Sequence, residues 1–183
     1  MFARRVFLPF LFLDNLEGNL FQVCIVMGSK SDLDLVRSSG MTDILDRVFE
    51  GSSYEYSVSV CSAHRNLMAL EDFARGACQD GAKVFIGIAG MAAALPGALA
   101  GCTLMAKPVI AVPLDEHGID SCIYMPPGVP VLTAGVGKPG LKNAAIAACQ
   151  ILAIGDHDLE LSLMRYISKN NKQAEFNIDL KES

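Results

Sequence analysis

Short apolar runs recur along this chain at the spacing of a strand–helix repeat. They cover residues 22–27, 55–61, 83–88, 108–113 and 129–135, and helix-like stretches lie between them. Strands that alternate with helices form a parallel sheet built from right-handed crossover units. The runs contain few polar residues, as expected for strands covered by helices on both faces. We therefore predict an α/β protein with a central parallel sheet.

Polar residues and glycines mark where the intervening helices begin and end. Ser31 and Asp32 are expected to cap a helix that runs to about Phe49, and Asn66 is expected to cap the next one. A later helix is predicted over residues 139–154, with a proline in its first turn and a glycine just beyond its end.

The same pattern divides the chain into three parts, within one domain of ordinary size. Residues 1–21 are an N-terminal arm, residues 22–155 the α/β catalytic domain, and residues 156–183 a C-terminal helix and tail. The arm has a short apolar run after two arginines, but no small-residue cleavage site follows, so we do not interpret it as a signal peptide. The last helix is interpreted as an appendage, with a neighbouring subunit as one candidate packing partner.

Composition narrows the classes of partner. The net charge of -5 and the scattered Lys and Arg residues provide no basic surface for nucleic acid or for a membrane. The six cysteines show no CxxC spacing, which favours a reducing, cytoplasmic environment over a disulfide framework. Because 51% of the residues are hydrophobic, we expect some apolar surface to be covered in a homo-oligomer.

Two polar loops follow the first two apolar runs and contain candidate chemistry. Residues 28–32 supply a glycine that admits a ligand close to the backbone, two serine hydroxyls and the Asp32 carboxylate. Their spacing fits neither the Walker A loop nor the GxGxxG fingerprint. Taken alone, this segment is better explained as an ordinary strand–helix turn with a Ser/Asp cap.

The second loop, residues 62–65, contains His64 and Arg65. Histidine titrates near neutral pH and serves as acid or base, and arginine binds phosphate or carboxylate through two parallel hydrogen bonds. Ligands of parallel α/β sheets bind outside the carboxyl ends of the strands, so the two loops are expected to meet at one site. The alternative is a polar turn with a surface histidine.

A third segment, residues 88–97, is rich in small residues and follows the third apolar run. Small side chains let the loop press against a ligand, but they also permit tight helix packing, and both explanations stay open. His117 follows two acidic residues, yet no second ligand group lies at a metal-site spacing, so no metal is predicted. His157 is expected to be exposed at the start of the last helix.

Taken in order, these motifs resemble the carboxyaminoimidazole ribonucleotide mutase / aminoimidazole ribonucleotide carboxylase family of purine biosynthesis. The matching residues run from about Val23 to about Met164, most of the chain, and the motifs at 25–32 and 62–65 are the most specific. The resemblance implies a flavodoxin-like three-layer α/β/α sandwich and an octamer with sites at subunit interfaces. It also implies that neither a metal nor an organic cofactor takes part.

The resemblance further implies the roles of individual residues. His64 would be the catalytic acid/base, and Ser29, Asp32 and Arg65 would hold the ribose phosphate of an imidazole ribonucleotide. The complete set of residues expected to bind substrate is Gly28, Ser29, Ser31, Asp32, Ser62, Ala63, Arg65, Gly90, Met91, Ala92 and Leu95.

Two branches of that family differ in their reaction. The mutase branch moves a carboxylate from the exocyclic nitrogen of the N-carboxylated ribonucleotide to a ring carbon, with carbon dioxide as a transient, and the animal-type branch takes carbon dioxide directly. Arg65 agrees with the mutases, whereas Ala94 stands where the bacterial mutase pattern has a histidine. The mutase reaction is our leading hypothesis. A direct carboxylase, a related nucleotide-carboxylating enzyme and a non-catalytic nucleotide-binding paralogue remain the alternatives.

Overall fold

The computed structural model describes residues 21–170, and it contains the predicted α/β architecture. The N-terminal arm up to residue 20 and the predicted tail from residue 173 lie outside the described residues. Five strands form one sheet: β1 (Val23–Met27), β2 (Tyr56–Val60), β3 (Val84–Ala89), β4 (Val109–Pro113) and β5 (Leu132–Thr133). All neighbouring strands are parallel, in the order β2-β1-β3-β4-β5, which is the flavodoxin-like order.

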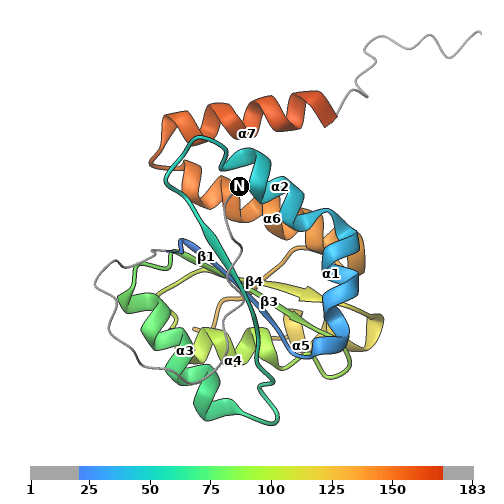
Figure 1. The fold of residues 1–183 in the computed structure, drawn as a ribbon. Coiled ribbons are helices and arrows are strands. Elements are labelled where there is room, and N and C mark those ends of the chain that lie inside the picture. The colour runs from blue at the N-terminus through green and yellow to red at the C-terminus, as the bar shows by residue number, and fades with distance from the viewer. Residues whose placement is uncertain (1–20, 171–183) are drawn as a thin grey trace, which may run out of the picture.

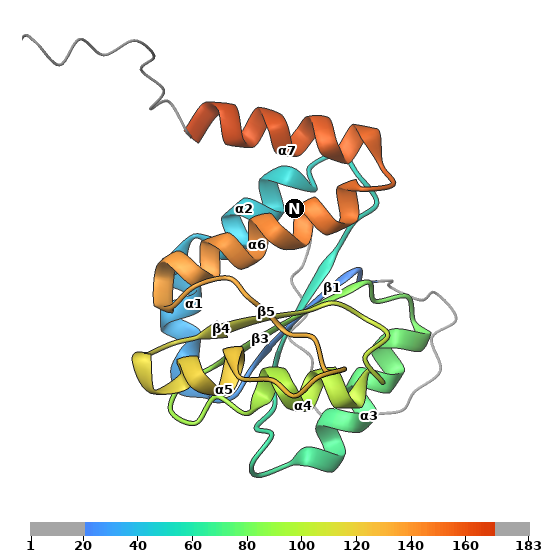
Figure 2. The same ribbon diagram turned by 180° about the vertical axis from the view of Figure 1, so that it is seen from behind.

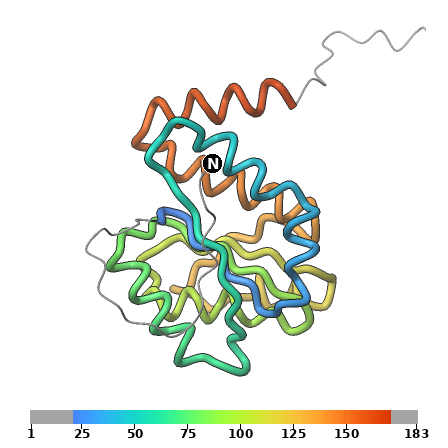
Figure 3. The backbone as a smooth tube through the Cα atoms, viewed as in Figure 1, coloured from blue at the N-terminus to red at the C-terminus, as the bar shows by residue number. Residues whose placement is uncertain are grey.

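Helices cover both faces of the sheet (Figures 1 and 2). One face carries α1 (Leu33–Ser39), α2 (Met41–Val48) and α6 (Gly137–Ala153), and the other carries α3 (Leu67–Gln79), α4 (Leu95–Cys102) and α5 (Ile119–Ile123). Two 3-10 turns, η1 (Lys30–Asp32) and η2 (Glu116–Gly118), precede α1 and α5. The backbone trace shows that α1 and α2, from the first part of the chain, lie on the same face of the sheet as α6, from its last part (Figure 3). The predicted three-layer sandwich is confirmed.

The central strands are continuous apolar runs because they are buried on both faces. Every residue of β1, β3 and β4 is buried, because each has a strand on either side and helices above and below. β3 also lies close to α4: a Cβ added at Gly87 would come within 3.1 Å of the Cα of Pro96. The small residues of this region therefore do serve tight packing.

The structure corrects the predicted helix over residues 31–49. It is divided into η1, α1 and α2, because Gly40 adopts a left-handed conformation (φ 80°) between α1 and α2. The cap also differs from the prediction: Ser29 is the N-cap residue, and Asp32 closes a reciprocal capping box on it. Asn66 does precede α3, but its side chain makes no capping hydrogen bond.

The predicted strand over residues 129–135 is also shorter in the structure. β5 retains two residues, Leu132 and Thr133, and pairs only with β4 at the edge of the sheet. Pro126, Pro127 and Pro130 precede it, and proline has no N–H to donate to a neighbouring strand. Edge position and proline content together explain the shortening.

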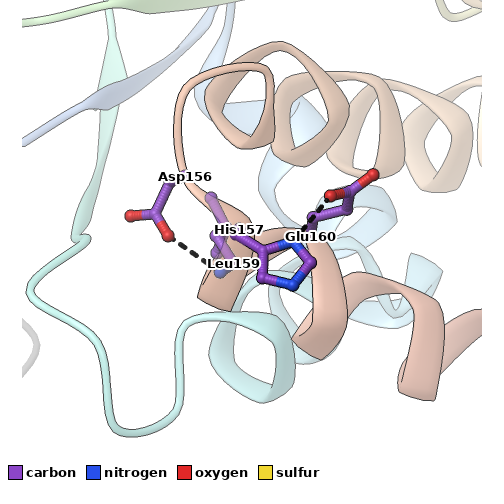
Figure 4. A network of polar contacts seen from close by, with 4 residues as sticks. All are labelled: Asp156, His157, Leu159 and Glu160. Atoms are coloured by element: carbon purple, nitrogen blue, oxygen red, sulfur yellow. Dashed lines mark hydrogen bonds and ion pairs between the residues drawn. The ribbon is translucent and has the colours of Figure 1, made fainter.

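The last helix, α7 (His157–Asn170), packs on its own chain rather than standing apart. It buries Leu159 and Leu163 in the core shared with α2 and α6, outside the sandwich itself (Figure 1). Asp156 caps its first turn, since Oδ1 accepts the N–H of Leu159 at 3.0 Å (Figure 4). Tyr54 Oη donates to the other oxygen of Asp156 at 3.1 Å, which ties α7 to the segment before β2.

Candidate active site

One pocket lies at the carboxyl ends of β1, β2 and β3, and its volume is about 340 Å³. It lies where the strand order reverses, next to the border of β1 and β3, which is the usual ligand position in this topology. All twelve residues predicted for the site line it, namely Gly28, Ser29, Ser31, Asp32, Ser62, Ala63, His64, Arg65, Gly90, Met91, Ala92 and Leu95. The structure therefore brings the three motifs together.

The first loop is fixed by hydrogen bonds among its own residues. Gly28 N–H donates to the carbonyl of Ile88 at 2.9 Å and holds the loop against β3. Ser31 Oγ donates to Ser29 Oγ at 2.8 Å, and Ser29 N–H donates to Asp32 Oδ2 at 3.1 Å. These bonds order two hydroxyls and a carboxylate before any ligand arrives, which lowers the conformational entropy cost of binding.

The second loop presents its two candidate side chains outward. Cys61 N–H donates to the carbonyl of Met27 at 2.9 Å, and Asn66 N–H donates to the carbonyl of Ser62 at 2.8 Å, so the turn is anchored at both ends. His64 and Arg65 lie at its tip and are both exposed. Within residues 21–170 neither side chain has a hydrogen-bond or ion-pair partner, so both are available to a ligand.

The third segment forms a wall of small residues and ends in α4. Leu95 opens this helix and is buried, and Ala92 and Met91 are exposed on the loop before it. Met91 and Ala93 have positive φ values of 55° and 32°, a conformation that residues other than glycine rarely adopt. The segment therefore packs tightly and also lines the pocket, and its contact with a ligand stays a prediction.

The structure adds to the twelve residues of the predicted set. Ala89, Ala93 and Ala94 of the third segment also line the pocket, with Ala94 at the N-cap position of α4. Asp115, which lies outside the pocket lining, accepts a hydrogen bond from Met91 N–H through Oδ2 at 3.0 Å. The only available signal for Asp115 was its position just beyond the fourth apolar run, at the same edge of the sheet.

The other two histidines lie outside the pocket. His117 belongs to η2, and His157 lies at the start of α7, where its Nδ1 is 3.1 Å from Glu160 Oε2 (Figure 4). The side chain of His157 is 77% exposed, as predicted. In the part of the chain that the structure describes, no group of three or more His, Cys, Asp or Glu residues is arranged to hold a metal ion. All six cysteines are free thiols.

Fold and pocket together define a flavodoxin-like α/β protein with a pocket at the switch point of its sheet, where proteins of this topology usually bind their ligands. The family model of AIR carboxylase matches residues 22–173, so the chain belongs to the AIR carboxylase family. Among the described residues, no helix is long and apolar enough to cross a membrane.

Curated relatives and solved structures agree with this family. The N5-carboxyaminoimidazole ribonucleotide mutase of Methanocaldococcus jannaschii is 40% identical over 157 residues, covering 83% of this chain and 92% of the relative. The mutase of Escherichia coli strain K12 is 41% identical over 153 residues, with 80% and 86% covered. A crystal structure of Treponema denticola PurE is 27% identical, with a TM-score of 0.64, covering 81% of this chain and 90% of that one.

Proposed function

We propose that this protein is a mutase that converts N-carboxyaminoimidazole ribonucleotide into carboxyaminoimidazole ribonucleotide. The observation that carries the proposal is the pocket itself, because it joins the hydroxyl-rich first loop to His64 and Arg65 of the second. Relatives that are about 40% identical over most of the chain are named for this reaction, which supports the proposal.

The first two loops would hold the nucleotide part of the substrate. Arg65 is the only cation among the described residues that line the pocket, and a guanidinium binds a phosphate through two hydrogen bonds. Ser29 and Ser31 offer hydroxyls, and the Asp32 carboxylate accepts hydrogen bonds from ribose hydroxyls. These groups come from the ends of β1 and β2, so they fix the ribose phosphate next to β3.

The reaction transfers a carboxyl group from the exocyclic nitrogen to a ring carbon, and the nitrogen gains a proton while that carbon loses one. The bond between the exocyclic nitrogen and the carboxyl carbon breaks, carbon dioxide leaves, and the nitrogen gains a proton. The ring carbon then attacks carbon dioxide and forms a new carbon–carbon bond, and the resulting cation loses its ring proton. His64 is the only histidine in the pocket and would deliver the first proton and accept the second.

The small residues of the third segment would retain carbon dioxide between the two steps. Gly90, Ala92 and Ala93 line the pocket next to the second loop. A trapped reactant reacts at a much higher effective concentration than one recaptured from water, and exclusion of water prevents its escape. Transfer within one pocket therefore needs no bicarbonate from solution.

We also propose that the protein works as a cytoplasmic homo-octamer. Leu67, Met68 and Tyr124 are 52%, 70% and 78% exposed, and such apolar side chains are candidates for burial against other subunits. The free thiols favour a reducing compartment. Light scattering at micromolar concentration is expected to give the mass of eight chains, and a monomeric mass would refute the assembly.

The direct test offers the purified protein each of two ribonucleotides, with and without bicarbonate. A mutase forms ring-carboxylated product from the N-carboxylated ribonucleotide without bicarbonate, and forms little from aminoimidazole ribonucleotide even when bicarbonate is present. The opposite preference would identify a direct carboxylase. Binding of either nucleotide without any product would identify a non-catalytic paralogue.

A further inference from the structure

The loop that walls the pocket beside β3 is held in an unusual shape. Met91 and Ala93 both have left-handed backbone conformations, with φ values of 55° and 32°. Such conformations carry a steric cost and persist only where the surrounding structure determines them. Within the loop one hydrogen bond, from Ala93 N–H to the carbonyl of Gly90 at 3.1 Å, closes the turn. The rest of the restraint must come from outside the loop.

The Asp115 carboxylate supplies that restraint from the segment after β4. Its Oδ2 accepts the N–H of Met91, and its Oδ1 accepts the N–H of His117, each at 3.0 Å. One side chain therefore joins the loop after β3 to the turn after β4. The hydrogen bond from Met91 is the main reason why the pKa of Asp115 lies below its ordinary value, so the carboxylate is charged at neutral pH.

The loop and the turn also fit closely against each other. A Cβ added at Gly90 would lie 2.8 Å from Asp115 Oδ2, and a Cβ added at Gly118 would lie 2.8 Å from the Cβ of Ala93. Neither position has room for a side chain without a shift of its neighbour. Loss of the Asp115 carboxylate would leave an unfilled space beside Gly90 and free the N–H of Met91, so the loop would relax.

We propose that Asp115 is a positioning residue for the transfer step: through Met91 N–H it fixes the wall formed by residues 90–93. Its own side chain does not line the pocket, so it acts through the backbone of the loop. The proposal rests on the proposed function, because that wall confines the migrating carboxyl group. Ser29 and Arg65, which would hold the ribose phosphate, lie in the loops after β1 and β2, so most of the nucleotide affinity is expected to remain without Asp115.

The test compares Asp115→Asn and Asp115→Ala with the neighbouring control Glu116→Gln. Misplacement of a reacting group by about 1 Å costs up to about a hundredfold in rate, so we expect kcat of Asp115→Ala to fall about tenfold or more. The KM is expected to stay within about twofold, because ground-state binding is retained. Asp115→Asn keeps one acceptor oxygen and is expected to lose less, and Glu116→Gln is expected to match the wild type.

Amide hydrogen exchange provides a readout that does not depend on activity. Exchange in peptides covering residues 90–93 is expected to accelerate in Asp115→Ala and to be unchanged in Glu116→Gln. Unchanged exchange in Asp115→Ala, or accelerated exchange with normal kcat, would overturn the proposal, as would an increase in KM equal to the loss in kcat/KM. Wild-type protein without turnover would instead overturn the proposed function, so the two failures are distinguishable.

Discussion

Arg65 shows most simply how one side chain serves the proposed function. It is exposed at the tip of the second loop and has no protein partner within the described residues, although it lines the pocket. Arg65→Ala should therefore weaken binding of the ribonucleotide by about 1.5–3 kcal/mol, the range for a hydrogen bond to a charged group. Isothermal titration calorimetry measures this directly.

Arg75 offers a matched control for that substitution. It lies on α3 and forms an ion pair with Glu71 at 2.8 Å, one turn away on the same helix and outside the pocket. Arg75→Ala removes the same charge and is expected to leave the affinity unchanged. An equal loss of affinity in the two variants would mean that Arg65 acts only through the overall electrostatic field of the protein. Its proposed contact with phosphate would then be wrong.

Ala94 tests whether the pocket accommodates a second imidazole. It is half-buried at the N-cap position of α4 with an ordinary φ of -70°, so a larger side chain meets no backbone strain. Ala94→His is expected to keep or raise turnover of the N-carboxylated ribonucleotide, since histidine occupies this place in the mutase pattern. Loss of turnover in a stable Ala94→His protein would contradict a mutase-shaped pocket.

Ala93 is the control for the effect of size at this wall. Its side chain is 1% exposed, and the backbone there has a positive φ of 32°. An added ring would crowd Gly118, where a Cβ would already lie 2.8 Å from the Cβ of Ala93, and overpacking typically costs about 1–3 kcal/mol. Urea unfolding should therefore show Ala93→His to be clearly less stable than Ala94→His.

At the scale of single residues, the sequence predicted which residues line the pocket but missed Asp115. The predicted residues follow apolar runs, and strand ends of a parallel sheet meet by geometry, so their meeting needed no knowledge of packing. Asp115 instead binds the N–H of Met91, which lies 24 residues away. A backbone amide has no sequence signature, and the contact exists only once β3 and β4 are paired.

Among the elements, the break between α1 and α2 makes a stability prediction. Gly40 has φ 80°, where a side chain is strained, so Gly40→Ala is expected to destabilise the protein by about 1–2 kcal/mol. Gly76 lies inside α3, and a Cβ there would meet nothing within 4 Å. Gly76→Ala is therefore expected to stabilise by about 0.5–1 kcal/mol.

Urea unfolding of the two glycine variants measures both shifts in the free energy of unfolding. Opposite signs are the expected result, because Gly40 has a positive φ that strains a side chain, whereas Gly76 is helical and has open space for one. If Gly40→Ala were stabilising, α1 and α2 would form one continuous helix, as the sequence pattern over residues 31–49 had indicated.

The elements differ in how far local sequence determines them. β1, β3 and β4 are buried throughout, so their apolar runs marked them to within about one residue. The helix break at Gly40 was not predictable, because glycine is tolerated inside helices and its conformation here depends on how α1 and α2 pack. The packing of α7 on its own chain was missed for the same reason. An amphipathic pattern shows that one face of a helix is covered, but it does not show which helix covers it.

For the whole molecule, three buried thiols predict alkaline instability. Burial raises the pKa of Cys24 and of Cys122 to about 11 and that of Cys149 to about 12. An unfolded thiol ionises at a pKa of about 8.5, so above that pH the unfolded chain loses protons that the folded chain retains. The contribution of these thiols to the free energy of unfolding is therefore fully present below about pH 8.5. It is lost as pH rises toward the folded pKa values, by about 1.4 kcal/mol per pH unit for each thiol.

Urea unfolding between pH 7.5 and pH 10 measures this dependence. Cys149→Ala isolates one thiol, and its slope above pH 9 should be shallower than that of the wild type by about 1.4 kcal/mol per pH unit. A slope identical to the wild type would show that Cys149 does not remain protonated in the folded protein at these pH values.

The central claim is that His64 carries the proton in a carboxyl transfer within one pocket. The most direct measurement is the initial rate of ring-carboxylated product from N-carboxyaminoimidazole ribonucleotide, without bicarbonate, for wild type, His64→Asn and His157→Asn. His157 is an exposed histidine on α7 that pairs with Glu160 outside the pocket, so it controls for the loss of an imidazole. The account predicts turnover by wild type and His157→Asn and a loss of about a hundredfold or more in His64→Asn. Absence of product from wild type, or near-normal turnover by His64→Asn, would contradict it.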